Sequence, residues 1–305
     1  MTVKWARTLV GLALAISASS AFAQEAVRVG SKIDTEGALL GNMIIRMLEA
    51  KGIKTQDKLS LGPTKIVRSA LVAGEIDIYP EYTGNGAFFF SIDTDPVWKN
   101  AKGGYEKVKA LDAEKNRLIW LRAAPASNTW AIALRKDVAG TNKLATMDDF
   151  AKWLARGGQL KLAASAEFVE SPAALPSFEK TYGFKLKQDQ IVTLAGGNTA
   201  ATERAAAEKT SGVNAAMAYG TDGALAALGL VVMADPKGAQ IVYQPAPVVR
   251  AAVLEKHPAI KGALEPVFAS LTLATLQGLN AKIAVEGQDA KQVATDYLKA
   301  KGFLK

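Results

Sequence analysis

We predict an α/β protein built from two lobes that are joined by two crossovers. Short apolar segments alternate with segments of helical spacing through most of the 305 residues. This alternation is typical of parallel sheets covered by helices on both faces. The pattern runs from about residue 27 to 121 and starts again near residue 147. Extended segments near residues 129 and 243 connect the two rounds.

The start of the chain carries the three parts of a secretory signal peptide. Lys4 and Arg7 give a positive beginning, residues 8–18 are a short apolar run, and residues 21–23 match the A-x-A cleavage pattern. A retained membrane anchor is the alternative, but a transmembrane helix needs about 20 apolar residues, more than this run provides. We therefore expect residues 1–23 to be removed.

The chain contains no cysteine. Disulfides, thiolate metal sites and cysteine nucleophiles are therefore excluded, and no lipid can be attached at the predicted cleavage point. We expect a soluble periplasmic protein without a lipid anchor. Loss of Lys4 and Arg7 lowers the net charge from +8 to +6. The lysines are scattered instead of forming an arginine-rich run, so we expect no nucleic-acid partner.

The first round of the pattern predicts four strands and three helices. The helix that begins near Glu36 is the clearest, because its apolar residues recur at helical spacing up to Gly52. Asp95 resembles an N-cap, since proline follows at the first helical position. In order, the predicted elements are strand Val27–Gly30, a helix over about 36–52, strand Lys58–Gly62, helix Thr64–Ala73 closed by Gly74, strand Ile76–Ile78, a helix from Asp95 towards Asn116, and strand Leu118–Leu121.

An aromatic stretch with two glycines follows the third predicted strand. We interpret residues 79–90, YPEYTGNGAFFF, as a loop at the mouth of a cleft. Tyr79 alternates with Asp77 and is a candidate for the core. Phe88–Phe90 most simply anchor the loop to its lobe.

The second round repeats the alternation. Its helix after residue 195 opens with Gly196-Gly197-Asn198-Thr199, which is either an anion site at a helix amino end or, as we prefer, an ordinary strand-to-helix turn. In order, we predict strand Thr129–Arg135, helix Met147–Ala155, strand Leu160–Ala164, a helix around Ala173–Tyr182, strand Gln190–Leu194, a helix to Lys209, strands Asn214–Ala218, Leu230–Met233 and Ile241–Tyr243, and helices over about 259–301.

Motifs that carry enzyme chemistry are scarce. The only histidine, His257, stands in a polar turn, and we expect it at the surface. Without a second histidine or a cysteine there is no triad and no imidazole metal cluster, and no phosphate-loop or dinucleotide fingerprint is present. We expect no enzyme, no cofactor and no metal. A carboxylate-dependent hydrolase remains an alternative, because Glu81, Asp77, Glu167 and Asp222 all fall near strand ends.

Aromatic residues from separate segments are predicted to converge on one cleft. Tyr82 follows the third strand, Trp130 lies at the first crossover, Tyr219 ends a strand of the second lobe, and Tyr243 lies at the second crossover. Ligands of open α/β sheets bind beyond the carboxyl ends of the strands. A ring face attracts a bulky cation by roughly 0.5 to 2 kcal/mol per contact. The pattern therefore favours a site for a cation.

Several segments resemble the osmoprotectant-binding proteins of ABC importers, the ProX/OpuC-like quaternary-ammonium binders, and within them the OsmF (YehZ) branch. The segments are GSKIDTE (30–36), GEIDIYPEYTG (74–84), NTWA (128–131), AEF (166–168) and AYGTD (218–222). The resemblance covers essentially the whole mature chain. It implies a type II periplasmic binding protein fold whose lobes, 24–129 plus 241–305 and 130–240, close over a betaine- or choline-like osmolyte. The implied partners are an ABC permease and its ATPase, and we expect a monomer.

The same resemblance implies which residues touch the ligand. Four rings surround the ammonium head, and Trp130 stands where relatives commonly have tyrosine, which keeps a π face. The implied ligand-binding residues are Tyr82, Trp130, Tyr219, Tyr243, Thr64, Thr221 and Asp222.

Three positions depart from the pattern of these relatives. Ser171 stands where they tend to have an arginine near the ligand's carboxylate, Ala173 where they have an aspartate, and Gly37 where many have a glutamine. Loss of a bidentate carboxylate partner removes a charge-assisted hydrogen-bonded pair. A second interpretation therefore stays open, in which the same fold binds an amino acid or another polar solute, with glycine betaine bound weakly or not at all.

Overall fold

A computed structural model describes Met1 and residues 25–194 and 199–305. Apart from Met1, the predicted signal peptide lies outside the described residues. The turn at Gly196-Gly197-Asn198 also lies outside them.

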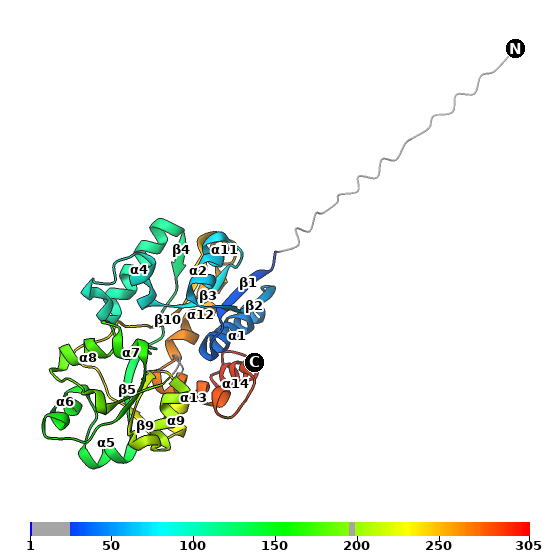
Figure 1. The fold of residues 1–305 in the computed structure, drawn as a ribbon. Coiled ribbons are helices and arrows are strands. Elements are labelled where there is room, and N and C mark those ends of the chain that lie inside the picture. Colours follow the sequence, from blue (N-terminus) through cyan, green and yellow to red (C-terminus); the bar gives the residue numbers. More distant parts are fainter. Residues whose placement is uncertain (2–24, 195–198) are drawn as a thin grey trace.

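Two five-stranded sheets form the centres of two lobes (Figure 1). The strand order is β2-β1-β3-β10-β4 in the first sheet and β7-β6-β8-β5-β9 in the second. The strands of the first sheet are β1 (Val27–Lys32), β2 (Thr55–Gly62), β3 (Ile78–Tyr82), β4 (Leu118–Trp120) and β10 (Pro245–Arg250). Those of the second are β5 (Trp130–Arg135), β6 (Leu162–Ser165), β7 (Ile191–Leu194), β8 (Ala215–Tyr219) and β9 (Leu230–Val232). We call the first sheet with its helices lobe 1 and the second with its helices lobe 2.

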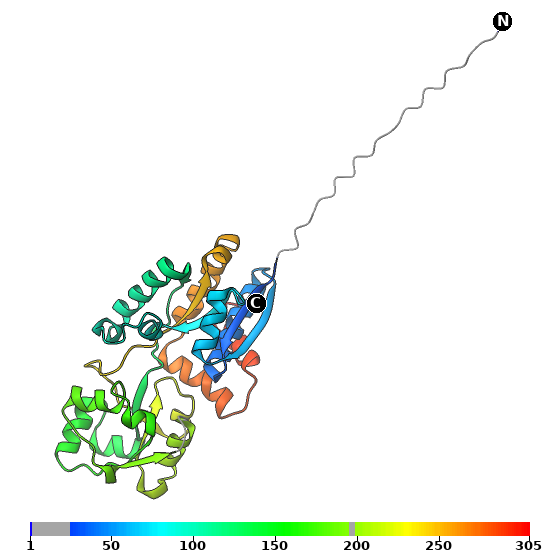
Figure 2. The ribbon, with the colours of Figure 1, turned by 45° about the horizontal axis from the view of Figure 1, so that its top comes forward.

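Helices flank both sheets (Figure 2). Lobe 1 carries α1 (Thr35–Ala50), α2 (Thr64–Ala73), α3 (Gly86–Phe89), α4 (Ala101–Asn116), α11 (Ala251–Lys256), α12 (Ala259–Ser270), α13 (Leu273–Ala284) and α14 (Ala290–Ala300), with the 3-10 turns η1 (Thr83–Asn85) and η2 (Pro96–Lys99). Lobe 2 carries α5 (Lys136–Asn142), α6 (Met147–Ala155), α7 (Ala166–Glu170), α8 (Leu175–Tyr182), α9 (Thr199–Ala207) and α10 (Ala224–Ala227), with η3 (Gln188–Gln190) and η4 (Thr210–Gly212).

Each sheet is buried on both of its faces, as the alternation predicts. In lobe 1, Leu264 and Leu298 belong to the cluster on one face and Trp98 to the cluster on the other. In lobe 2, Phe178 and Leu225 belong to the two corresponding clusters. The predicted two-lobed α/β architecture is therefore confirmed.

One strand in each sheet is antiparallel, where fully parallel sheets were predicted. β10 runs antiparallel to β3 and β4, and β5 runs antiparallel to β8 and β9. The neighbours β1, β2 and β3 are mutually parallel, as are β6, β7 and β8. The reason is connectivity: β5 and β10 are the strands by which the chain enters one lobe from the other.

The third strand differs most from its prediction. β3 covers Ile78–Tyr82, so the segment expected to begin a loop is a strand buried between β1 and β10. Pro80 faces Pro247 across the antiparallel pair, where neither residue has an N–H to donate. The prediction failed because β3 pairs with β10, a strand about 165 residues later in the chain that local patterns cannot reveal.

The segment Ile241–Tyr243 is not a strand, which corrects a second prediction. It is the second crossover, and it is hydrogen-bonded to the first one. The N–H of Asn128 donates to the carbonyl of Tyr243 at 2.9 Å, and the N–H of Tyr243 donates to Ser127 Oγ at 3.0 Å. Thr129 Oγ1 donates to the carbonyl of Ile241 at 2.7 Å.

Two side-chain placements also differ from their predictions. Phe89 lies against the Arg68 guanidinium at 4.3 Å and Phe90 packs on the core, but Phe88 is 54% exposed. Phe88 is therefore no anchor. His257, which stands between α11 and α12, is buried, not at the surface.

Among the described residues, no single helix combines the length and apolar composition needed to cross a membrane. α12 and α13 meet that test only as a pair, and they are bent by 92° at their junction.

Candidate functional site

A cleft of about 950 Å³ lies between the lobes, at the carboxyl ends of strands β1, β3 and β8. All seven predicted ligand-binding residues line this one cleft. They are Thr64, Tyr82, Trp130, Tyr219, Thr221, Asp222 and Tyr243. The structure thus brings together residues that are up to 179 positions apart (Thr64 and Tyr243) in the sequence.

The wall from lobe 2 is aromatic. Trp130 begins β5 and Tyr219 ends β8, and the two residues are paired across these antiparallel strands. Their rings meet edge to face, with centroids 6.0 Å apart and planes at 78°. Phe168 stacks behind Trp130 at 5.2 Å and 22°. Such packing fixes the ring positions, so the wall is formed before a ligand arrives.

Tyr243 extends the aromatic wall from the second crossover. Its ring lies against the backbone of Gly84, where an added Cβ would come within 2.7 Å of the ring carbon Cδ1. Gly84 therefore permits this close approach. Burial raises the pKa of the Tyr243 phenol, so this ring stays neutral.

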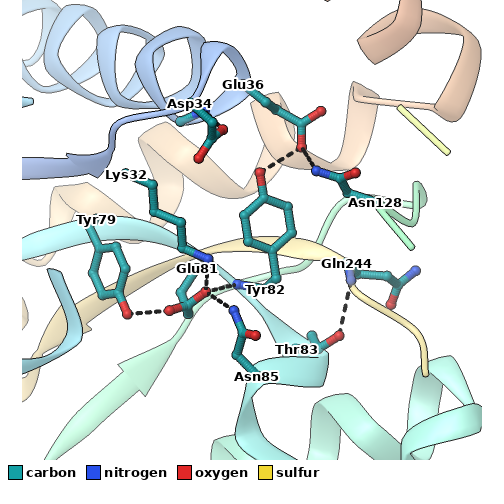
Figure 3. Close-up of polar contacts among 11 residues, drawn as sticks. Lys32, Asp34, Glu36, Tyr79, Glu81, Tyr82, Thr83, Asn85, Asn128 and Gln244 are labelled. Atoms are coloured by element: carbon teal, nitrogen blue, oxygen red, sulfur yellow. Dashed lines mark hydrogen bonds and ion pairs between the residues drawn. The ribbon is translucent and has the colours of Figure 1, made fainter. Parts of the chain in front are cut away.

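Tyr82 lines the cleft, and its ring and its hydroxyl already have protein contacts (Figure 3). Its hydroxyl donates to Glu36 Oε1 at 2.7 Å, and the Lys32 ammonium lies 4.4 Å from its ring centroid. Lys32 also pairs with Glu81 Oε1 at 2.7 Å. The cation on this ring is thus one that the protein supplies itself.

Glu81 is a fully buried acceptor on β3 (Figure 3). Besides Lys32, it accepts the Tyr79 hydroxyl at 2.5 Å, the Tyr82 N–H at 2.6 Å and the Asn85 amide at 2.7 Å. Asp77 lies at the opposite end of β3, where it pairs with arginines. Neither carboxylate lines the cleft, so the two acids proposed in lobe 1 for a hydrolase have structural roles.

Four carboxylates and a single ammonium line the described part of the cleft. The acids are Asp34, Glu36, Glu167 and Asp222, and the ammonium is that of Lys32. Burial raises the pKa of the Tyr219 phenol, and the charges of Glu167 and Asp222 raise it further. The cleft therefore favours a positively charged group near the lobe 2 wall.

Hydrogen bonds join the lobes across the cleft. Asn280 on α13 donates to Glu36 Oε2 at 2.8 Å and to the carbonyl of Thr221 at 2.9 Å. Glu36 is buried, and this burial raises its pKa despite the hydrogen bonds it receives. Gly223 lies so close to α13 that an added Cβ would meet the Ala281 nitrogen at 2.2 Å.

The three departures from the resembling proteins have different surroundings. Ser171 and Ala173 line the cleft on its lobe 2 side, where the described lining residues include no basic side chain. Gly37 is buried at the start of α1, and an added Cβ would lie 2.9 Å from the carbonyl of Lys32.

Thr64 stands at the first position of α2 and lines the cleft from lobe 1.

Several cleft residues were missed by the sequence reasoning. Lys32 ends β1 and Asp34 and Glu36 follow it, so the rule that ligands lie beyond strand ends was a usable signal for them. Asn280 carried no such signal, because only the packing of α13 brings it to the cleft. Among the described residues, no group of three or more histidine or acidic side chains is arranged to hold a metal ion.

The fold and cleft together define the class of this protein. Its two sheets and crossovers match the fold of type II periplasmic binding proteins, and residues 25–300 match the family model of the substrate binding domain of the ABC-type glycine betaine transport system. The chain belongs to this family, and the resemblance stated above is confirmed. It is 62% identical over 304 residues, covering 99% of this chain and 98% of the relative, to "Glycine betaine-binding protein YehZ" of Escherichia coli (strain K12).

Solved structures agree with this assignment. The structure of apo YehZ from Escherichia coli superimposes with a TM-score of 0.86 at 63% identity, covering 92% of this chain and 99% of that one. A crystal structure described as a glycine betaine/carnitine/choline ABC transporter gives a TM-score of 0.80 at 22% identity, covering 92% and 100%. The second match shows the shared fold.

Proposed function

We propose that this protein captures a quaternary-ammonium solute, betaine- or choline-like, in the cleft between its lobes and delivers it to an ABC permease. One observation carries the proposal. Trp130, Tyr219 and Tyr243 line the cleft together with Glu167 and Asp222. Rings provide π faces for a cation that is too bulky for hydrogen bonding, at roughly 0.5 to 2 kcal/mol per contact. The two carboxylates add attraction for its positive charge.

The remaining predicted residues have supporting roles in this proposal. Tyr82 completes the cage with the part of its ring that faces the cleft, while Lys32 keeps its place over that ring. Thr64 and Thr221 border the ligand from the two lobes, and Asp222 contributes charge. The lobes proposed here divide as 24–129 plus 241–305 and 130–240, and they close over the solute.

The setting of the protein follows from the same proposal. We propose a monomer that works in the periplasm after removal of residues 1–23, has no catalytic activity, and meets a permease with its ATPase at the inner membrane. Membership of the substrate-binding family supports this proposal.

Titration calorimetry with glycine betaine, choline and carnitine tests the proposed ligand class on protein stripped of bound solute. We expect heat with at least one of them. Tyr219→Ala and Tyr243→Ala should each weaken its binding by about five- to thirtyfold, as expected for the loss of roughly 1 to 2 kcal/mol of ring contact. The matched variants Tyr219→Phe and Tyr243→Phe keep the ring and should retain most of the affinity. Absence of heat with all three solutes overturns the quaternary-ammonium assignment.

A second candidate is an amino acid or other polar solute, with glycine betaine bound weakly or not at all. Ser171 and Ala173 favour it, because these cleft residues replace the arginine and aspartate of the resembling proteins. A hydrogen-bonded ligand depends little on ring faces. Its affinity should therefore change little in Tyr219→Ala, whereas the affinity for a cation should fall by about five- to thirtyfold.

A further inference from the structure

A second carboxyl group lies behind Asp222, outside the cleft lining. Glu203 projects from α9 and is 1% exposed. The two carboxyl groups are within hydrogen-bonding reach of each other. Two ionised carboxylates cannot hydrogen-bond, since both only accept. One shared proton converts this repulsive contact into a hydrogen bond.

One oxygen of Glu203 has no other compensation for its burial from the part of the chain that the structure describes. Its Oε1 is buried and has no hydrogen-bond partner among the described residues. Asp222 is better served, because its Oδ2 accepts the N–H of Tyr219 at 2.7 Å and its carboxyl also receives the Thr199 hydroxyl. Asp222 is therefore the member of the pair that holds the negative charge.

The titratable groups beside Asp222 come from two elements. α9 contributes Glu203 and β8 contributes the Tyr219 phenol, and Glu167 of α7 acts on that same phenol. Burial and the charge of Asp222 raise the pKa of Glu203 far above that of a free glutamate, and burial also raises the pKa of Asp222. The pKa of the Tyr219 phenol is also raised, so this phenol stays neutral while the pair titrates.

We propose that Glu203 and Asp222 hold a single proton near neutral pH, and that Glu203 thereby sets the charge that Asp222 presents to a cationic solute. Glu203 is then a positioning residue for affinity, although it does not touch the ligand. The effect on binding rests on the function proposed above, whereas the sharing of a proton by the two carboxyl groups does not.

The direction of the pH effect follows from the charge of the pair. With one proton the pair carries one negative charge. Acidification through the raised pKa of Asp222 adds a second proton, removes that charge and weakens cation binding. Alkaline titration of Glu203 adds a second negative charge and strengthens it. A neutral glutamine at position 203 removes the alkaline step.

Carboxyl ¹³C NMR of the ligand-free protein tests the shared proton directly. The signal assigned by its loss in Glu203→Gln should remain that of a protonated carboxyl at neutral pH and move only in the alkaline range. A Glu203 carboxyl that is already ionised at neutral pH, or that titrates near the usual value of about 4.3, overturns the proposal. This measurement needs no ligand.

Calorimetry with choline tests the effect on binding, because choline is a permanent cation with no group that titrates between neutral and alkaline pH. Wild-type affinity should rise by about five- to tenfold from neutral to alkaline pH, as an extra charge a few ångströms away provides. Glu203→Gln should show no such rise. Glu208→Gln, a change at an exposed position of the chain just after α9, should behave like the wild type.

The two measurements separate the possible failures. Choline binding with the same pH profile in Glu203→Gln and wild type overturns the role of Glu203 in affinity. If choline does not bind at all, the proposed ligand class is at fault, and the NMR titration still decides whether the pair shares a proton. If Glu203→Gln does not fold, through-bond correlations along the Glu203 side chain assign its carboxyl signal in the wild type, and the alkaline titration of that signal remains decisive.

Discussion

Two aspartates show how the position of a residue along its strand decides its role. Asp77 precedes β3, at the sheet edge away from the cleft, and accepts hydrogen bonds from Arg28 Nε and the Arg28 N–H, both at 2.9 Å, and from Arg250 Nη1 at 3.2 Å. These arginines lower the pKa of Asp77. Asp222 follows β8 at the cleft, where no arginine meets it among the described residues and burial raises its pKa. The first aspartate stabilises the fold, and the second can serve a ligand.

We expect Asp77→Asn to destabilise the protein by about 2 kcal/mol at neutral pH, since hydrogen bonds to charged groups contribute about 1.5 to 3 kcal/mol. The pKa of Asp77 is lowered in the folded state, so its contribution is present above the unfolded value of about 3.9 and is lost as pH falls through the folded value. Denaturant unfolding at neutral and acidic pH measures this. The gap between wild type and variant should narrow in acid, and a constant gap contradicts the ion-pair explanation.

At the scale of elements, the short turn η1 holds the second crossover in place. Thr83 Oγ1 donates to the carbonyl of Val242 at 3.0 Å, and the Thr83 N–H donates to that of Gln244 at 3.0 Å. The Gln244 N–H in turn donates to Thr83 Oγ1 at 3.1 Å (Figure 3). Gly84 follows Thr83 in this turn, and its backbone packs closely against Ile241 and Tyr243. The turn therefore sets where the Tyr243 ring stands in the cleft.

Gly84→Ala should displace the Tyr243 ring, because its Cβ would lie 2.6 Å from Ile241 Cγ2 and 2.7 Å from Tyr243 Cδ1. We expect a loss of about 1 to 3 kcal/mol of stability, as for other overpacked sites, together with weaker binding of the solute found by calorimetry. Gly140→Ala is the matched control, because nothing lies within 4 Å of its added Cβ. A Gly84→Ala variant with wild-type affinity would show that Tyr243 does not contribute to binding.

For the whole molecule, α13 adds a third connection between lobes besides the two crossovers. Gln277 donates to the carbonyl of Gly220 at 2.7 Å, and Asn280 bridges Glu36 and Thr221. Both side chains reach from α13 to the loop after β8. The relative orientation of the lobes is thus fixed partly by a helix near the end of the chain.

Asn280→Ala should loosen this connection, because it leaves the buried Glu36 and the carbonyl of Thr221 each without one donor, at about 1 to 3 kcal/mol. Small-angle scattering should show a larger radius of gyration, and hydrogen exchange should speed up in α10. Asn142→Ala removes a hydrogen bond within α5, away from the lobe contact, and should leave both readouts unchanged. Unchanged scattering and exchange in Asn280→Ala would refute a role of this residue in lobe orientation.

Local patterns were enough for most elements and for the cleft, but not for non-local pairing. The apolar spacing that includes Leu39 and Leu40 correctly predicted the first helix, and Gly74 correctly predicted the end of the second. The positions of strand ends predicted that the aromatic rings would lie in the cleft. The antiparallel direction of β10 and the full length of β3 both follow from the pairing of these two strands, which are distant in the sequence. Local sequence patterns could therefore predict neither. Glu203 was missed because its meaning comes only from its contact with Asp222.

The hydrogen bonds between the two crossovers have a mechanical consequence. Ser127–Thr129 and Ile241–Tyr243 are tied by bonds from Asn128, Tyr243 and Thr129, so neither segment can bend without carrying the other. Two independent connectors would let the lobes twist as well as close. Two connectors that are hydrogen-bonded to each other bend as one unit, and mainly about one axis. Bending at the crossovers would then move both segments together, and Tyr243 would keep its place against the first crossover.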